Sequence, residues 1–182
     1  MRRTILPMVL FSLFLLGAVG CTHEHTLVAF SPARAPLQRA GNKKVAIVLD
    51  ERLVQTRYET STDGHTFVLN GAPAMLAEGF SRALAGTVAA LQTFPAPPPT
   101  GFDVRIIPQL TIEASGMLSH RCTARLAISV EDRAGRPVMR KEGAGEETFV
   151  PIANGTAACE TAILAAFNNV AYQALSAIDA MP

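Results

Sequence analysis

Apolar residues recur along the chain with two different periods, which predict both strands and helices. Residues 45–49 form a short unbroken apolar run, which is typical of a strand buried on both faces. Residues 53–69 alternate weakly around Asp63-Gly64, which favours a hairpin or an ordered loop with its turn at that dipeptide.

Two longer segments have the spacing of amphipathic helices. The first predicts a helix that starts near Asn70 and Pro73 and ends near Thr93, before the prolines at positions 95 and 97–99. The second predicts a C-terminal helix over residues 158–178, after a loop at Asn154-Gly155. The apolar stripes are Leu76, Phe80, Leu84, Val88 and Leu91 in the first helix and Ile163, Leu164, Phe167, Val170, Ala171, Ala174, Leu175 and Ile178 in the second.

Between the two predicted helices, apolar and polar residues alternate with a period of two. Residues 104–112 and 122–130 each have one apolar and one polar face, and a turn at residues 132–135 leads to a third strand that can continue to Phe149. Pro108 cannot donate a hydrogen bond to a neighbouring strand, so it predicts a sheet edge or a bulge. The element order indicates an α+β domain, with two amphipathic helices packed on one face of a largely antiparallel sheet.

The N-terminus has the three parts of a secretory signal peptide. Arg2 and Arg3 precede an apolar stretch at residues 5–16, and Ala-Val-Gly at residues 18–20 precedes Cys21. This arrangement resembles the lipobox of bacterial lipoproteins, which implies cleavage before Cys21 and acylation of its thiol. A transmembrane helix is the weaker interpretation, because the apolar run is shorter than the roughly 20 residues that span a bilayer.

This resemblance divides the chain into three parts. A lipoprotein signal peptide spans residues 1–20, a lipidated N-terminus and tether spans residues 21–43, and a single periplasmic α+β domain spans residues 44–182. Pro32 and Pro36 and the lack of a period indicate the tether, of which only a piece at residues 26–30 is expected to dock as an edge strand.

The residue after the lipobox cysteine predicts which of the two membranes holds the protein. It is Thr22 rather than Asp, which in lipoproteins commonly signals retention in the inner membrane. We therefore expect the acyl chains to hold the protein in the outer membrane, on its periplasmic side.

Charge excludes a nucleic-acid-binding protein. The chain has 16 basic and 15 acidic residues, and loss of the signal peptide removes two arginines and no acid, which leaves 14 against 15 and a net charge of −1. No basic cluster stands out. Aromatic residues make up only 6% of the chain and tryptophan is absent, so we expect an aliphatic core.

Acylation of Cys21 leaves two cysteines, Cys122 and Cys159. Cys122 begins the apolar face of its strand, and Cys159 lies four residues before Ile163, on the apolar side of the last helix. Outside the cytoplasmic membrane such a pair favours a disulfide. Two separate buried thiols are the alternative, because the sequence does not establish the close Cα approach that a bridge requires.

Candidate metal and catalytic groups are few. His23 and His25 flank Glu24, but a solvated linker explains them better than a zinc site, which needs four fixed donors. Ser119 and His120 are neighbours on a predicted strand, so their side chains should point to opposite faces. We expect no enzyme, no metal and no cofactor.

Two further clusters have structural explanations. The charged residues 50–52 follow a buried strand, where a solvated strand end is commoner than a site. Gly143 and Gly145 predict a bulge or a strand end rather than a phosphate-binding loop.

The whole layout resembles the small YajG-like lipoproteins and, more distantly, LPS-assembly and ABC-transport auxiliary lipoproteins. The features that carry the resemblance are the lipobox, the Ser31-Pro32 tether, the buried first strand, the long helix, the paired strands with their turn at residues 132–135, and the Ala-rich last helix. The resemblance implies a non-catalytic periplasmic domain on an outer-membrane anchor, often part of a larger envelope assembly.

Two functions remain open. The favoured one is an interaction protein that binds an envelope protein partner and contacts the membrane through its acyl chains. The alternative is a domain that binds or carries a lipid or another apolar ligand. An open cleft lined by Ile106, Leu110, Leu126 and Ile128 would favour ligand binding, and a filled core would favour the interaction protein.

Overall fold

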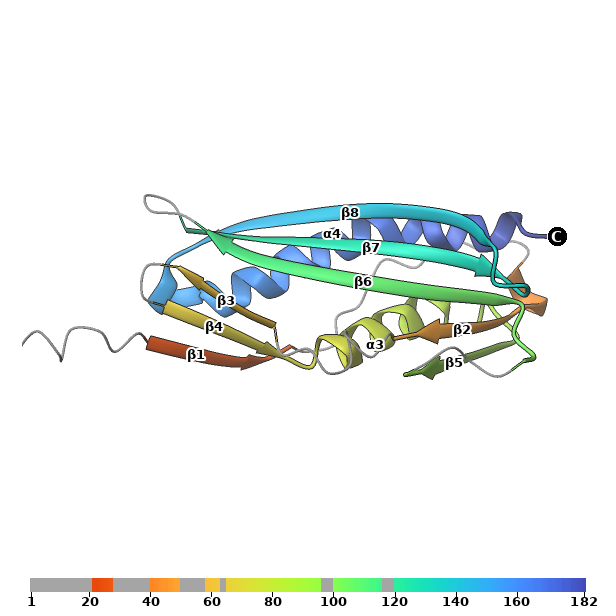
Figure 1. The fold of residues 1–182 in the computed structure, drawn as a ribbon, viewed down its shortest axis with the longest axis horizontal. Coiled ribbons are helices and arrows are strands. Elements are labelled where there is room, and N and C mark those ends of the chain that lie inside the picture. The colour runs from red at the N-terminus through yellow and green to blue at the C-terminus, as the bar shows by residue number, and fades with distance from the viewer. Residues whose placement is uncertain (1–20, 28–39, 50–57, 63–64, 96–99, 116–119) are drawn as a thin grey trace, which may run out of the picture.

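The computed structural model describes residues 21–27, 40–49, 58–62, 65–95, 100–115 and 120–182. The predicted signal peptide, the Asp63-Gly64 turn and the charged residues 50–52 lie outside this described part. The molecule is elongated, and β1 begins at the end opposite the C-terminus (Figure 1).

The larger sheet has five strands in the order β5-β2-β6-β7-β8. The long pairings of β6 with β7 and of β7 with β8 are antiparallel, whereas the short β2 is parallel to β5 and β6. The structure confirms an α+β fold with a mostly antiparallel sheet, and the parallel strands are additional to the prediction. The strands are β2 (Lys44–Val48), β5 (Ala90–Phe94), β6 (Val104–Ser115), β7 (His120–Asp132) and β8 (Pro137–Phe149).

A second sheet, which the pattern did not predict as a unit, has the order β1-β4-β3. Its strands are β1 (Cys21–Thr26), β3 (Tyr58–Thr62) and β4 (His65–Asn70). β3 and β4 are antiparallel, and Thr62 is paired with His65 across the expected turn, which confirms the hairpin.

β1 shows that the predicted N-terminal tether begins with a strand of the folded domain. An edge strand is present over Cys21–Thr26 and runs parallel to β4 over its full length, whereas residues 28–30 of the predicted piece lie outside the described part of the chain. Leu27 follows it, is buried, and donates its N–H to the Asn70 oxygen at 2.8 Å. The first seven residues of the predicted tether therefore belong to the folded domain.

α3 (Ala72–Leu84) is shorter than predicted. Gly86 has φ of 74°, a left-handed conformation that ends a right-handed helix, and the N–H of Thr87 bonds back to the Leu84 oxygen at 3.0 Å. Val88 and Leu91 still pack against the core, but from the turn after α3 and from β5. The apolar spacing therefore continued past the true end of the helix.

α4 (Pro151–Ala180) begins earlier than predicted and is interrupted at Asn154, where φ is −149°. The Asn154 side-chain oxygen accepts the Val150 N–H at 2.8 Å, so the expected irregularity at Asn154-Gly155 lies inside the helix. A short 3-10 helix, η2 (Ala40–Asn42), precedes β2. Among the described helices, none combines the length and the hydropathy that crossing a bilayer would require.

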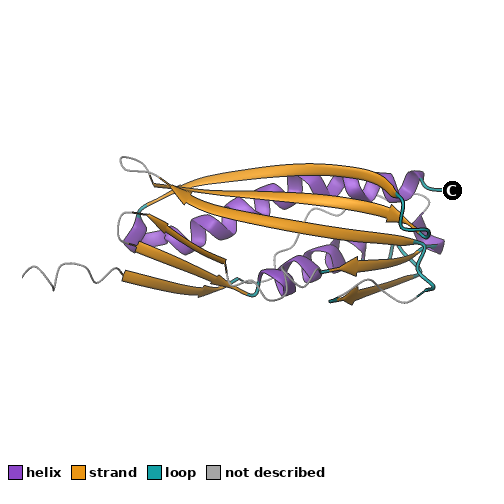
Figure 2. Ribbon diagram, viewed as in Figure 1, coloured by secondary structure: helices purple, strands orange, loops and turns teal. Residues whose placement is uncertain are grey.

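The core is largely aliphatic and draws on both sheets and both helices. α4 runs along β7 and β8 (Figure 2), and the inward side chains of β7, at every second residue from Cys122 to Val130, are fully buried. α3 meets α4 through Phe80 and Phe167, whose ring centroids are 4.9 Å apart.

Gly143 and Gly145 lie in the middle of β8, so the predicted bulge or strand end is wrong. Both face α4. A Cβ at Gly145 would collide with the Ala162 oxygen, and one at Gly143 would lie 3.0 Å from the Val170 Cβ. Among the described residues of β7 and β8, the register of the pairing shifts only between Val130 and Glu131. The two glycines therefore serve close helix–sheet packing.

Pro108 lies in β6, which is paired with β2 only near its first residues. β2 pairs with residues 104–106 of β6, whereas Pro108 pairs with Ile128 of β7 and lies beyond the end of the β2 pairing. On the β2 side, β6 is therefore an edge strand at Pro108. A residue without a backbone N–H is tolerated there because β2 does not extend to it.

The variant Gly145→Ala tests the close packing. We expect it to lower the free energy of unfolding by about 1–3 kcal/mol, because the added Cβ pushes the α4 backbone away from β8. Urea unfolding measures the change, and Ala144→Val, at an exposed position of the same strand, is the matched control. Equal stability of Gly145→Ala and wild type would contradict this account.

Candidate functional site

Cys21 is the first residue of β1 and its side chain is exposed. It is paired with His65 at the start of β4, at the end of the molecule farthest from the C-terminus (Figure 1). The acylation predicted for this thiol would therefore attach lipid directly to a strand of the domain.

His23 and His25 are contacts within the fold rather than parts of a solvated linker. The His23 ring stacks on Phe67 of β4 at 5.3 Å, and His25 Nε2 lies 3.2 Å from a carboxylate oxygen of Glu160 on α4. In the described part of the chain, no three His, Cys, Asp or Glu side chains are grouped as a metal would need.

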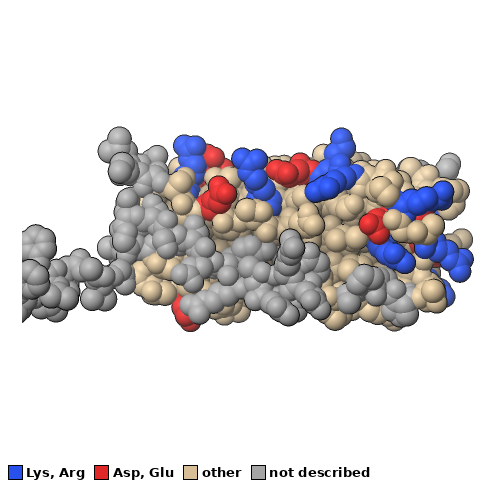
Figure 3. All heavy atoms as spheres, in the orientation of Figure 1, with Lys and Arg blue, Asp and Glu red and all other residues tan. Residues whose placement is uncertain are grey.

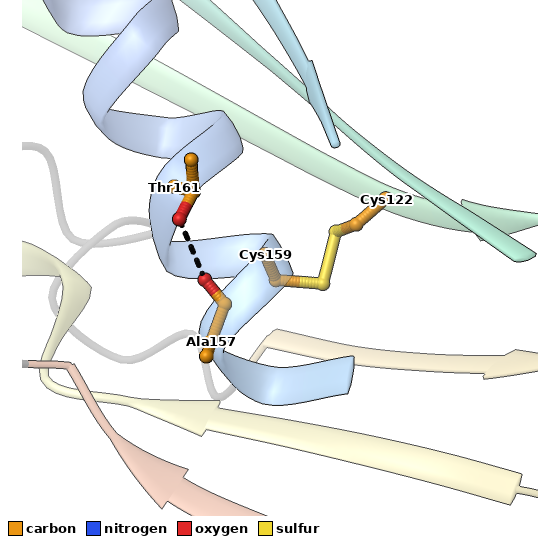
Figure 4. The surroundings of a disulfide bond; sticks show 4 residues. All are labelled: Cys122, Ala157, Cys159 and Thr161. Carbon is orange, nitrogen blue, oxygen red and sulfur yellow. Dashed lines mark hydrogen bonds between the residues drawn. A yellow bond between two sulfur atoms is a disulfide. The ribbon is translucent and has the colours of Figure 1, made fainter. Parts of the chain in front are cut away.

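Cys122 and Cys159 form a disulfide between β7 and the first turns of α4 (Figure 4). Their Cα atoms are 5.2 Å apart and both residues are fully buried, which confirms the predicted pair. Thr161 and Ala157 form a regular helical contact beside the bridge, from the Thr161 hydroxyl to the Ala157 oxygen at 3.0 Å. The bridge joins helix and sheet near the end that carries Cys21.

Aromatic rings connect the two sheets at the same end. Phe149, the last residue of β8, lies 5.3 Å from Phe67 and 5.6 Å from His120, measured between ring centroids. Gly155 leaves the room for this contact, because a Cβ there would collide with the Phe67 ring. Ser119, which precedes His120 and was predicted to point to the opposite face of the strand, lies outside the described residues.

The four residues whose exposure in a cleft would have favoured ligand binding lie in the core. Ile106, Leu126 and Ile128 are fully buried, and Leu110 is 8% exposed. They pack with the other core side chains of the larger sheet and the helices.

A groove of about 810 Å³ lies at the opposite end of the molecule, and we call it the terminal groove. The β7–β8 turn, the last turns of α4 and the residues before β2 and β6 surround it. Its lining residues are Lys43, Asp103, Asp132, Arg133, Ala134, Arg136, Val138, Met139, Ala177, Ala180, Met181 and Pro182. Basic side chains with some acidic ones among them cover this end in Figure 3.

Charged groups fix the walls of the terminal groove. The Lys43 amine donates to the oxygens of Met181 and Pro182 at 2.9 and 2.8 Å, which ties the end of α4 to the chain before β2. Asp103 accepts the Lys44 N–H at 2.9 Å. Val138 is 49% exposed, so the groove presents apolar surface between these charged groups.

Asp132 organises the β7–β8 turn that forms one wall. One carboxylate oxygen accepts the backbone N–H groups of Ala134 and Arg136, both at 2.9 Å, and the other accepts the Arg136 guanidinium at 2.7 Å. The backbone and side-chain hydrogen bonds from Arg136 lower the pKa of Asp132 below its ordinary value. Gly135 completes the turn with φ of 78°, so the predicted turn is confirmed.

The outer face of β7 and β8 has a different chemistry. Arg121 pairs with Glu146 at 3.0 Å and Arg125 with Glu142 at 3.5 Å, which gives the alternating basic and acidic side chains visible along these strands in Figure 3. These pairs are exposed, so they keep the face solvated and contribute little stability.

Sequence reasoning missed the terminal groove. Its walls come from residues near positions 43, 103, 132–139 and 177–182, which are far apart in the chain. Only the turn after Asp132 had a local signal, and no periodicity shows that the end of α4 lies beside it.

The sequence matches no protein-family model and none of the curated proteins. Solved structures show similarity of fold. The protein XCC0632 from Xanthomonas campestris, assigned to DUF330, matches with a TM-score of 0.57 and 14% identity over 86% of this chain and 96% of that one. The shared fold is therefore that of a DUF330 protein.

Two further structures match with lower TM-scores. Lipoprotein GNA1162 from Neisseria meningitidis has a TM-score of 0.36 and 16% identity, covering 58% of this chain and 83% of its own. The hypothetical protein CT253 from Chlamydia trachomatis has a TM-score of 0.41 and 11% identity, covering 76% and 95%.

Asp132→Asn tests the turn at the terminal groove. Because the native pKa of Asp132 is lowered, its carboxylate stabilises the fold above the ordinary carboxyl pKa of about 3.9, and this stabilisation is lost as the pH falls through the native value. We expect the variant to be less stable than wild type at pH 7 and the difference to vanish in acid. Urea unfolding over a pH series measures it; a difference that is absent at pH 7 would refute the role of Asp132.

Proposed function

We propose that the protein is a non-catalytic lipoprotein that is acylated at Cys21 and held at the periplasmic side of the outer membrane. There it acts as an interaction or assembly component of an envelope complex. The observation that carries the proposal is the placement of an exposed lipobox cysteine at one end of the domain and of the terminal groove at the other.

Three features support the lipoprotein assignment. The signal-peptide pattern ends at Cys21, and Thr22 follows it, which favours the outer membrane over the inner one. The buried Cys122–Cys159 disulfide fits an oxidising compartment. The layout of the sequence resembles YajG-like lipoproteins, and this finer family assignment is part of the proposal.

The buried core supports an interaction protein over a ligand carrier. Ile106, Leu126 and Ile128 are inaccessible, so a ligand between sheet and helices would have to displace packed side chains. We also infer that α3 and α4 cover the same face of the larger sheet, because Phe80 and Phe167 are in contact.

The terminal groove is the surface we assign to the protein partner. It combines exposed apolar residues such as Val138 with a charged rim that includes Arg133 and Asp132, as interfaces do. Binding of an apolar ligand in the same groove is the second candidate function, and it is favoured by the apolar side chains of Val138 and Met139 in the lining.

Affinity capture from detergent-solubilised membranes tests the proposal with two matched variants. Val138→Glu places a carboxylate in the terminal groove, and Tyr172→Glu places one on the exposed face of α4, where Tyr172 is 59% exposed against 49% for Val138. An unpaired charge buried at an interface costs at least about 1.4 kcal/mol, so Val138→Glu should recover roughly tenfold less of one defined partner.

Tyr172→Glu should recover as much partner as wild type. If both variants retain the partner, the groove is not its binding site. If wild type enriches no protein but its groove holds an extractable lipid, the second candidate function replaces the first.

A further inference from the structure

We propose that the Cys21 end of the domain docks directly against the lipid headgroups of the membrane that anchors it, so that the terminal groove faces away from the bilayer. The inference rests on the proposed attachment of lipid at Cys21. It adds an interaction surface, the membrane-facing end, defined by Cys21, His23, His120 and Val150.

Very little chain separates the predicted lipid attachment point from the folded domain. A free tether of 23 residues could extend up to about 75–83 Å, which would leave the domain remote from the membrane and free to turn. Instead, β1 begins at Cys21 itself and pairs with β4 from that residue onward. No free residues separate the attachment point from the first strand.

The Cys21 end is rigidly joined to the rest of the domain. His23, Phe67, Phe149 and His120 form a continuous series of ring contacts from β1 through β4 and β8 to β7. The disulfide of Cys122 fixes β7 to α4 beside it. A lipid fixed at Cys21 therefore orients the whole molecule and not β1 alone.

Histidines are concentrated in the strands of the membrane-facing end. The sequence has four histidines, and all of them lie in strands here: two in β1, His65 at the start of β4 and His120 at the start of β7. The rings of His23 and His120 are partly buried on apolar neighbours and partly exposed. Such rings, with an apolar body and a polar edge, suit a headgroup layer.

The long strand β8 separates the two ends. Val138 is the second residue of β8 and Val150 directly follows its last residue, and they are 49% and 63% accessible. At about 3.3 Å per residue they are roughly 40 Å apart. If Val150 lies near the headgroups, this separation places Val138 and the terminal groove away from the membrane surface.

Single-tryptophan reporters test the orientation, because the chain has no native tryptophan. Residues 21–182, which contain every described element, are coupled through the Cys21 thiol to a maleimide phospholipid in phosphatidylethanolamine–phosphatidylglycerol vesicles. Some of the lipids have nitroxide headgroups that quench nearby tryptophan. The coupling is chemical, so the result is independent of acylation in cells, which the mass of the native protein decides separately.

We expect Val150→Trp to be quenched several-fold more than Val138→Trp. Insertion of ten Gly/Ser residues between Cys21 and Thr22 adds a flexible span of about 17 Å and should make the two signals alike. Thr148→Trp and Ala134→Trp, also at exposed positions of the two ends, serve if either valine variant fails to fold. Equal quenching without the insertion, or no effect of the insertion, would overturn the proposed docking.

Discussion

The rest of the structure depends on the close contact between α4 and the middle of β8. Gly143 and Gly145 have no side chains, so the helix backbone approaches the strand to a distance that a Cβ would prevent. The Asn169 side chain adds a hydrogen bond to the Ala144 oxygen at 2.7 Å, and the Cys122–Cys159 disulfide fixes the start of the same helix. Held in this way, α4 and the sheet form one long body with two distinct ends.

The two ends have different chemistry, and the proposed function follows from their separation. One carries the exposed Cys21 on a strand that is locked into the domain by ring stacking, and the other carries the terminal groove between charged walls. A lipid anchor at the first end and a partner at the second would place the partner at a set distance from the membrane. The packed core between the two ends favours a rigid spacer over a domain that carries a ligand in its interior.

The sequence predicted most of what depends on local periodicity. The buried strand near residue 45, the β6–β7–β8 strands, the hairpin, the Asp132 turn and the inward faces of Cys122 and Cys159 all carry such patterns. The sequence did not predict the features that depend on backbone geometry or on contacts between distant segments. The apolar spacing ran past Gly86, which ends α3, and nothing in the polar residues 21–26 signals a strand, because β1 is held by backbone pairing. The terminal groove joins remote segments, and only its turn after Asp132 had a local signal in the sequence.

Intact-mass spectrometry of the protein extracted from membranes tests the central claim most directly. The account predicts a chain that begins at Cys21, carries the added mass of acyl chains, and shows two alkylatable thiols only after reduction, at Cys122 and Cys159. A chain that retains residues 1–20, or one that begins elsewhere and carries no lipid, would contradict it.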